Sequence, residues 1–191
     1  MANLAKENKV TFGLKNAHYA TFTEDADGSI TYDKPVPLLG SKEMSMDPKG
    51  ELSEFYADDT VYYVADSNQG YEGSYTLAEL PEQFRIDVLG EKLENGVITE
   101  NANAKIKPIA LLFEFDGDVK ATRHVLYNVK VSRPGLSSAS KEESVDPNTI
   151  ELSFTASPRA DGVVKRKTSV SMDDAAYNAW YSSVFEPAPT V

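Results

Sequence analysis

Apolar and polar residues alternate over much of the chain, and this period of two predicts a protein built mainly from β-strands. The clearest case is residues 71–77, where Tyr71, Tyr75 and Leu77 fall on one side and polar residues fall on the other. The predicted strands cover residues 17–23, 29–33, 40–46, 54–56, 60–64, 71–77, 106–115, 121–131, 149–156 and 163–171.

Turn-forming residues separate these strands. Aspartate and glycine favour turns at residues 25–28 and 116–118, and the second turn joins residues 106–115 and 121–131 into a long central hairpin. Asp58 and Asp59, with Ala57, form a turn between the runs 54–56 and 60–64. We expect further turns at residues 47–50, 67–70 and 157–162, the last of which closes a C-terminal hairpin.

Two segments have helical chemistry. Residues 80–89 place Pro81 at the first helical position and are followed by Gly90, which suits a helix end. Residues 174–185 form an amphipathic helix in which Ala176, Trp180 and Val184 recur every four residues, with Ser171 or Asp173 as its cap. Residues 91–104 and 137–146 are polar and predict exposed loops, the first with a turn at Asn95-Gly96.

Together these elements predict a mainly β, α+β protein. We expect a β-sandwich or partial barrel with one short helix and one C-terminal helix on its flank. Residues 1–13 read as an N-terminal arm, residues 14–185 as a single domain, and residues 186–191 as a tail that its prolines keep from continuing the helix.

The charge disfavours nucleic-acid readers. Thirty acidic residues against 19 basic ones give a net charge of −11, and phosphate backbones attract the opposite sign. Lys165-Arg166-Lys167 is the one basic run; at most two of its side chains share a face, which favours a charge pair with a neighbouring subunit. The chain has no cysteine for disulfides or thiolate sites, no apolar run of membrane-spanning length, and no signal-peptide core near its N-terminus.

Residues with catalytic or ligand-binding chemistry do not form a site in the sequence. His18 and His124 are far apart in strand patterns, and no nucleophile elbow or glycine-rich phosphate loop is present. Residues 23–34 resemble a calcium loop but have threonine and lysine at the first and twelfth positions, so a hairpin turn is favoured. Asp58 and Asp59 are adjacent in a turn rather than placed across a substrate. We therefore predict no catalytic residue, no cofactor and no metal.

Five short motifs carry a resemblance that covers most of residues 10–185. The chain resembles the major tail protein of long-tailed, non-contractile phages and prophages of Gram-positive bacteria, the subunit of their tail tube. The motifs are Phe12-Gly13-Leu14-Lys15-Asn16-Ala17-His18-Tyr19-Ala20, then Met46-Asp47-Pro48 with Gly50, Phe55-Tyr56-Ala57-Asp58-Asp59, Gly70-Tyr71-Glu72-Gly73, and Leu80-Pro81 with Phe84-Arg85 and Val88-Leu89-Gly90.

The resemblance implies a structural virion protein. Such subunits are similar to a β-sandwich with a flanking helix and assemble, in the host cytoplasm, into hexameric rings that stack into a tube for DNA ejection. The implied partners are other copies of the chain, the tape measure, tail-tip and tail-terminator proteins, and DNA that passes without specific binding; no membrane is implied. Edge strands, the N-terminal arm and residues 91–105 and 134–148 are candidate contact regions. The candidate assembly or family-motif residues are Phe55, Tyr56, Asp58, Asp59, Tyr71, Gly73 and Trp180.

Other functions remain open at this point. A ring-forming tube protein of a bacterial secretion or phage-derived system is similar in fold. A carbohydrate-binding module is supported only by analogy with tyrosine-rich β-sandwiches, and no aromatic cluster is evident in the sequence. A hydrolase that uses Asp58 or Asp59 lacks every supporting partner.

Overall fold

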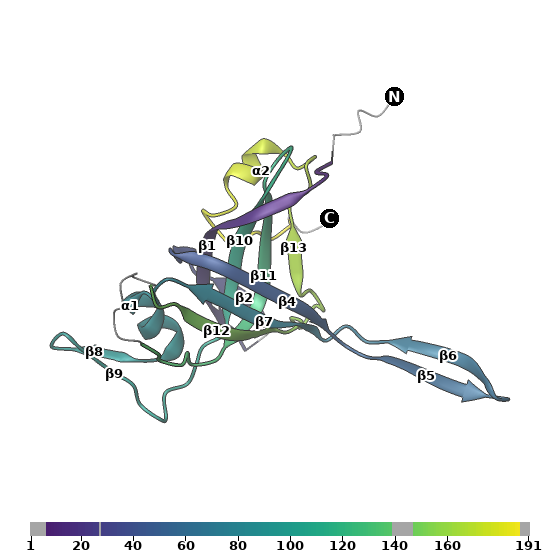
Figure 1. Ribbon diagram of the computed structural model, residues 1–191, viewed down its shortest axis with the longest axis horizontal. Coiled ribbons are helices and arrows are strands. Elements are labelled where there is room, and N and C mark those ends of the chain that lie inside the picture. Colours follow the sequence, from purple (N-terminus) through teal and green to yellow (C-terminus); the bar gives the residue numbers. More distant parts are fainter. Residues whose placement is uncertain (1–6, 27, 139–146, 188–191) are drawn as a thin grey trace.

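A curved antiparallel sheet of nine strands forms the body of the protein in the computed structural model, which describes residues 7–26, 28–138 and 147–187 (Figure 1). Seven strands follow the order β2-β1-β10-β11-β12-β7-β4, while β3 pairs with β1 and β13 pairs with β11. The strands are β1 (Thr11–Glu24), β2 (Ile30–Tyr32), β3 (Val36–Pro37), β4 (Ser41–Lys49), β7 (Gly70–Leu77), β10 (Ile109–Gly117), β11 (Thr122–Val131), β12 (Ile150–Ala156) and β13 (Lys165–Lys167).

The centre of the sheet, at β10, is buried on both faces. On β10, Ile109, Leu111 and Phe113 point into one apolar cluster, and Ala110 and Leu112 point into another. A strand that is buried on both faces has apolar residues at consecutive positions, which explains why β10 is the most apolar strand in the sequence.

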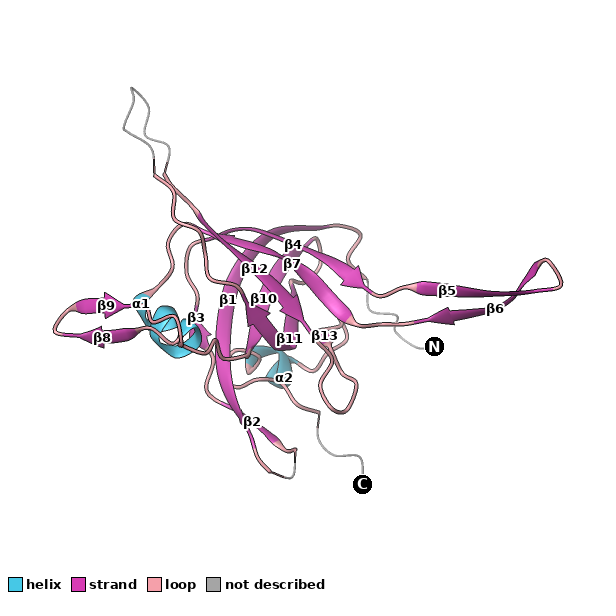
Figure 2. Cartoon of the chain, turned by 90° about the horizontal axis from the view of Figure 1, so that it is seen from below, coloured by secondary structure: helices cyan, strands magenta, loops and turns pink. Residues whose placement is uncertain are grey.

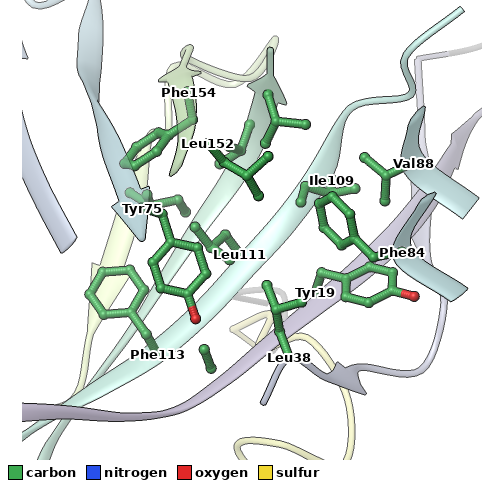
Figure 3. Close-up of a cluster of buried hydrophobic side chains, with 14 of the residues drawn as sticks. Tyr19, Leu38, Tyr75, Phe84, Val88, Ile109, Leu111, Phe113, Leu152 and Phe154 are labelled. Atoms are coloured by element: carbon green, nitrogen blue, oxygen red, sulfur yellow. The ribbon is translucent and has the colours of Figure 1, made fainter. Parts of the chain in front are cut away.

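The first cluster fills the concave side of the sheet. Tyr19 of β1, Tyr75 of β7 and Phe84 of the short helical segment meet there with residues of β10 and β12 (Figure 3). That segment consists of α1 (Glu82–Phe84) and the π-helical turn η1 (Arg85–Leu89), and it ends at Gly90 with φ 75°. A helical segment with its glycine stop was predicted correctly, but it begins at Glu82, so that Pro81 is its N-cap residue rather than its first helical position.

The second cluster lies under the C-terminal segment. Helix α2 (Asp174–Asn178) begins at Asp173, whose carboxylate accepts hydrogen bonds from the amides of Ala175 and Ala176, as expected of a cap. The helix is shorter than the predicted 174–185, because the chain continues in turns that still bury Trp180 and Val184.

The sheet curls into a partial barrel, which confirms the predicted fold. The strand at one end of the sheet, β4, contacts β1, the second strand from the other end, without a hydrogen-bonded ladder, and Thr11–Leu14 and Lys42–Met44 line one shallow pocket between them. β1 begins at Thr11, inside the segment predicted as an arm. The side chain of Asn8 also attaches this segment to the body: it donates to Lys120 O at 2.6 Å and accepts from the amides of Val119 and Lys120.

Two predicted connections are wrong. Residues 149–156 and 163–171 do not form a hairpin, since β12 pairs with β7 and β11, and β13 pairs with β11. The stretch 91–104, predicted as a loop, contains the small hairpin β8 (Lys92–Glu94) and β9 (Val97–Thr99), which turns at Asn95 and Gly96. Parts of the predicted arm, the second loop and the tail (residues 1–6, 139–146 and 188–191) lie outside the described residues.

The turns predicted at residues 47–50 and 67–70 are also wrong. β4 continues to Lys49 and pairs with β7 along its length, and the chain then runs outward through β5 (Leu52–Ala57) and back through β6 (Thr60–Asp66). Pro48 is tolerated in β4 because that strand lies at the edge of the sheet. The result is one long ribbon whose outer half, β5–β6, projects from the body at the end of the long axis opposite to β8–β9 (Figures 1 and 2).

Candidate assembly surfaces

The projecting β5–β6 hairpin contains four of the seven candidate residues. Its two strands turn at Asp58 and Asp59, which have φ of 51° and 57°. Positive φ at both central residues defines the turn whose twist suits a two-residue hairpin, and aspartate tolerates this conformation better than most residues. The predicted turn is therefore confirmed, and Phe55 and Tyr56 lie in β5 just before it.

The hairpin exposes much apolar surface. Seven of the fifteen exposed large hydrophobic residues in the described chain belong to it: Leu52, Phe55, Tyr56, Val61, Tyr62, Tyr63 and Val64. A two-stranded hairpin alone is marginally stable in water, and a concentration of exposed apolar side chains is typical of a binding surface.

The two faces of the hairpin differ in charge. Residues directly opposite each other share a face, and the strand register therefore assigns the side chains. One face, which we call the neutral face, consists of Ser53, Phe55, Ala57, Thr60, Tyr63 and Ala65. The other, which we call the acidic face, consists of Leu52, Glu54, Tyr56, Val61, Val64 and Asp66. Tyr62 lies at the register shift between them.

The acidic face carries its own internal contact. The hydroxyl of Tyr56 donates to Glu54 Oε2 at 2.6 Å, and this hydrogen bond raises the pKa of Tyr56. Between Gly50 and Gly70 the chain has five carboxylates and no lysine or arginine. The whole hairpin therefore presents negative charge alongside its apolar side chains.

The joint between hairpin and body is tightly built. The amide of Ser67 donates to Glu51 O at 3.2 Å, and the amide of Gln69 donates to Lys49 O at 2.7 Å, so the ladder continues past the sheet. A Cβ at Gly50 would overlap the carbonyl of Ser67, which explains the glycine at this close approach.

The other three candidate residues lie in the body. Tyr71 is half-buried at the base of the hairpin, and Lys165 Nζ lies 4.0 Å from the centre of its ring. Gly73 lies in β7 between β4 and β12, where a Cβ would overlap Ser45 O. Trp180 is buried and stacks on Phe185 at 5.1 Å between ring centres. The contacts of Gly73 and Trp180 are therefore internal to the subunit.

The basic run lies in β13 and alternates between faces, as predicted. Arg166 turns toward the C-terminal segment and forms a 3.8 Å ion pair with Glu186. Lys165 and Lys167 are exposed on the other face, opposite Leu126 and His124 of β11. Within the part of the chain that the structure describes, neither lysine has a carboxylate partner.

Comparison with known proteins identifies the family of the chain. The family model for the phage tail tube protein matches residues 1–181. The chain belongs to this family. A solved structure, the cryo-EM structure of the anti-feeding prophage cap (the cap that terminates the AFP tube), is similar with a TM-score of 0.44 and 10% sequence identity, covering 88% of this chain and 99% of that chain. None of the curated proteins matches the chain.

A phage tail tube protein is a structural component of a virion, and the family is in general not enzymatic. Among the described residues there is no group of three or more histidine, aspartate or glutamate side chains that could hold a metal ion. No helix in the same residues is long and apolar enough to cross a membrane.

The exposed aromatic surface of the β5–β6 hairpin was not predicted from the sequence. Tyr62 and Tyr63 were assigned to a strand without a role, and no aromatic cluster was found, although four aromatic side chains gather on the hairpin. The signal was present in residues 61–64, where four consecutive apolar residues break the alternation expected of a half-buried strand. These aromatic residues lie on a projecting ribbon, whereas small-molecule pockets are concave.

Proposed function

We propose that the chain is the major subunit of a phage tail tube, and that it forms hexameric rings which stack into the channel for DNA ejection. The observation that carries this proposal is the β5–β6 hairpin, which bears exposed apolar side chains on both faces. Such a ribbon gains most when both faces are covered at once, as happens when it inserts between neighbouring subunits.

Other copies of the chain are the expected partners that bury the two faces of the hairpin. The hairpin and the part of the body that would receive it are different surfaces, so each contact between two copies is heterologous. Heterologous contacts generate rings when the rotation closes, and they generate tubes when they repeat along an axis. The β8–β9 hairpin at the opposite end of the molecule and the segment before β1 are further candidates for contacts between rings.

The charge suits a channel for DNA. A net charge of −11 repels phosphate backbones, which favours passage of DNA without specific binding. The tape measure, tail-tip and tail-terminator proteins are the expected partners in the virion, after assembly in the host cytoplasm.

Electron microscopy of negatively stained protein across a concentration series tests this function. We expect rings or tubes with six-fold end views, either from the protein alone or after addition of purified tail-tip complex. The double variant Phe55→Ser/Tyr63→Ser removes the aromatic pair of the neutral face and should abolish these assemblies while leaving the monomer folded, since both side chains are exposed.

A matched control is Leu39→Ser, which removes an exposed apolar side chain between β3 and β4. It should assemble like the wild type. Wild-type protein that stays monomeric at every concentration and also fails to polymerise on the tail-tip complex would overturn the proposed function.

A further inference from the structure

We infer that the acidic face of the β5–β6 hairpin binds the exposed β13 surface of a second copy of this chain, with Glu54 and Asp66 facing Lys165 and Lys167. This inference rests on the proposed function, since it names the surface that receives the hairpin.

The acidic face combines charge with apolar area. Glu54 and Asp66 lie on it beside Tyr56 and Val64, which are about half exposed or more. Because the neutral face carries no charged residue, only the acidic face selects for a cationic partner. The same charges disfavour pairing between the acidic faces of two hairpins, since carboxylates would then lie close to carboxylates.

The β13 surface has the complementary chemistry. Lys165 and Lys167 are exposed beside the half-buried rings of Tyr71, Phe115 and His124, on the face of β11 that carries Leu126. Burial, and to a smaller extent the charges of these two lysines, lower the pKa of His124 to about 4. An apolar surface with two unpaired cations matches a ribbon with apolar side chains and two carboxylates.

The spacing of the charges also agrees. Glu54 pairs with Val64, so Asp66 is its diagonal neighbour, and such neighbours are about 7 to 8 Å apart. Lys165 and Lys167 are two residues apart on one strand, which separates them by about 6.6 Å. Each carboxylate can therefore face one lysine without distortion of either strand.

The backbone of β13 leaves room for a strand partner. Among the described strands β13 pairs only with β11, and the outer edge of the hairpin strands is likewise unpaired. No other described strand therefore covers the side of β13 from which the hairpin would approach. The lysines at the far end of the molecule are a poorer match, because Lys92 of β8 is followed two residues later by Glu94.

Zero-length cross-linking with a carbodiimide tests the contact in wild-type protein. This reagent joins a carboxylate to a lysine only where the two are in contact. A mixture of unlabelled and ¹⁵N-labelled copies should give mixed-isotope peptides that join Glu54 or Asp66 to Lys165 or Lys167. Mixed-isotope links from these carboxylates exclusively to other lysines, such as Lys92 or Lys107, would overturn the inference.

Charge reversal provides a second test. Lys165→Glu/Lys167→Glu should raise the protein concentration needed for assembly by roughly tenfold or more. Adding Glu54→Lys/Asp66→Lys in the same chain should restore assembly. Lys34→Glu/Lys130→Glu makes the same change of charge at two exposed lysines elsewhere and should assemble like the wild type.

The two proposals fail in different ways. If wild-type protein assembles and the reversal of Lys165 and Lys167 has no greater effect than the control, the inference is overturned and the tube function stands. If wild-type protein does not assemble with or without tail-tip complex, the tube function itself is overturned, whatever the variants do.

Discussion

Phe55 of β5 lies directly opposite Tyr63 of β6, and the two side chains remain 60% and 62% exposed. A cross-strand aromatic pair contributes roughly 0.2 to 1 kcal/mol to a hairpin relative to alanines. The pair leaves most of its apolar area available for a partner, while the backbone ladder that continues into the body through Ser67 and Gln69 supports the hairpin.

The turn at the hairpin tip should be sensitive to backbone preference rather than to charge. We expect Asp58→Ala/Asp59→Ala to destabilise the hairpin by about 1 to 2 kcal/mol per residue, because alanine is strained at positive φ. Amide hydrogen exchange across β5 and β6 measures this as lost protection. Asp58→Asn/Asp59→Gly removes the same two charges but suits the turn, so it should keep its protection. Equal loss in both variants would show that the carboxylates, not the backbone, hold the turn.

Gly73 should tolerate no side chain. A Cβ there would overlap Ser45 O and lie 2.8 Å from Met46 Cα, and both are backbone atoms of the neighbouring strand. We expect Gly73→Ala to lower the free energy of unfolding by about 1 to 3 kcal/mol, measured by urea denaturation. Gly135→Ala is the control, since no atom lies within 4 Å of its added Cβ, and it should stay within about 0.5 kcal/mol of wild type.

Local chemistry made part of the fold predictable. The turn at Asp58 and Asp59, the cap at Asp173 and the helix stop at Gly90 each depend on a residue's own backbone preference or on a hydrogen bond within a few positions. The central hairpin β10–β11 was also predictable, because its two strands are joined by a short turn.

Distant pairing was not predictable from the same signals. No local sequence signal makes β13 pair with β11 rather than with β12. The alternation over Tyr71–Leu77 predicts a strand but does not identify its neighbours β4 and β12. For the same reason the sequence indicated a turn at Asp47–Gly50 where the structure has an edge strand that continues outward. The sequence indicated the candidate residues but did not distinguish the exposed Phe55 and Tyr56 from Gly73 and Trp180, whose contacts are internal to the subunit.

Trp180 should matter for stability through its volume. It is buried in the second cluster, and its Nε1 has no hydrogen-bond partner among the described residues. We expect Trp180→Ala to cost about 3 to 5 kcal/mol. Trp180→Phe should cost clearly less, because it keeps a ring against Phe185 and removes a buried donor that was unsatisfied. Urea unfolding followed by circular dichroism compares them, and equal losses would indicate that the indole N–H is essential.

His124 should make the folded protein less stable as the pH falls. Burial, with the charges of Lys165 and Lys167, lowers its pKa from 6.5 to about 4. Between these values the unfolded chain binds more protons than the folded one, so the free energy of unfolding is largest above pH 6.5 and decreases toward pH 4, by at most about 3 kcal/mol. Urea denaturation at pH 4.5 and pH 7 measures the difference.

The matched variant for this prediction is His124→Phe. The ring of His124 stacks on Phe113 and tilts against Phe115, and its Nδ1 has no partner among the described residues, so phenylalanine can take its place without losing a hydrogen bond. Asp161 does not interfere, because Arg159 lowers its pKa from 3.8 to about 2 and its contribution is lost only as the pH falls below that window. We therefore expect His124→Phe to have a flatter dependence between pH 4.5 and pH 7. An unchanged dependence would assign it to other groups.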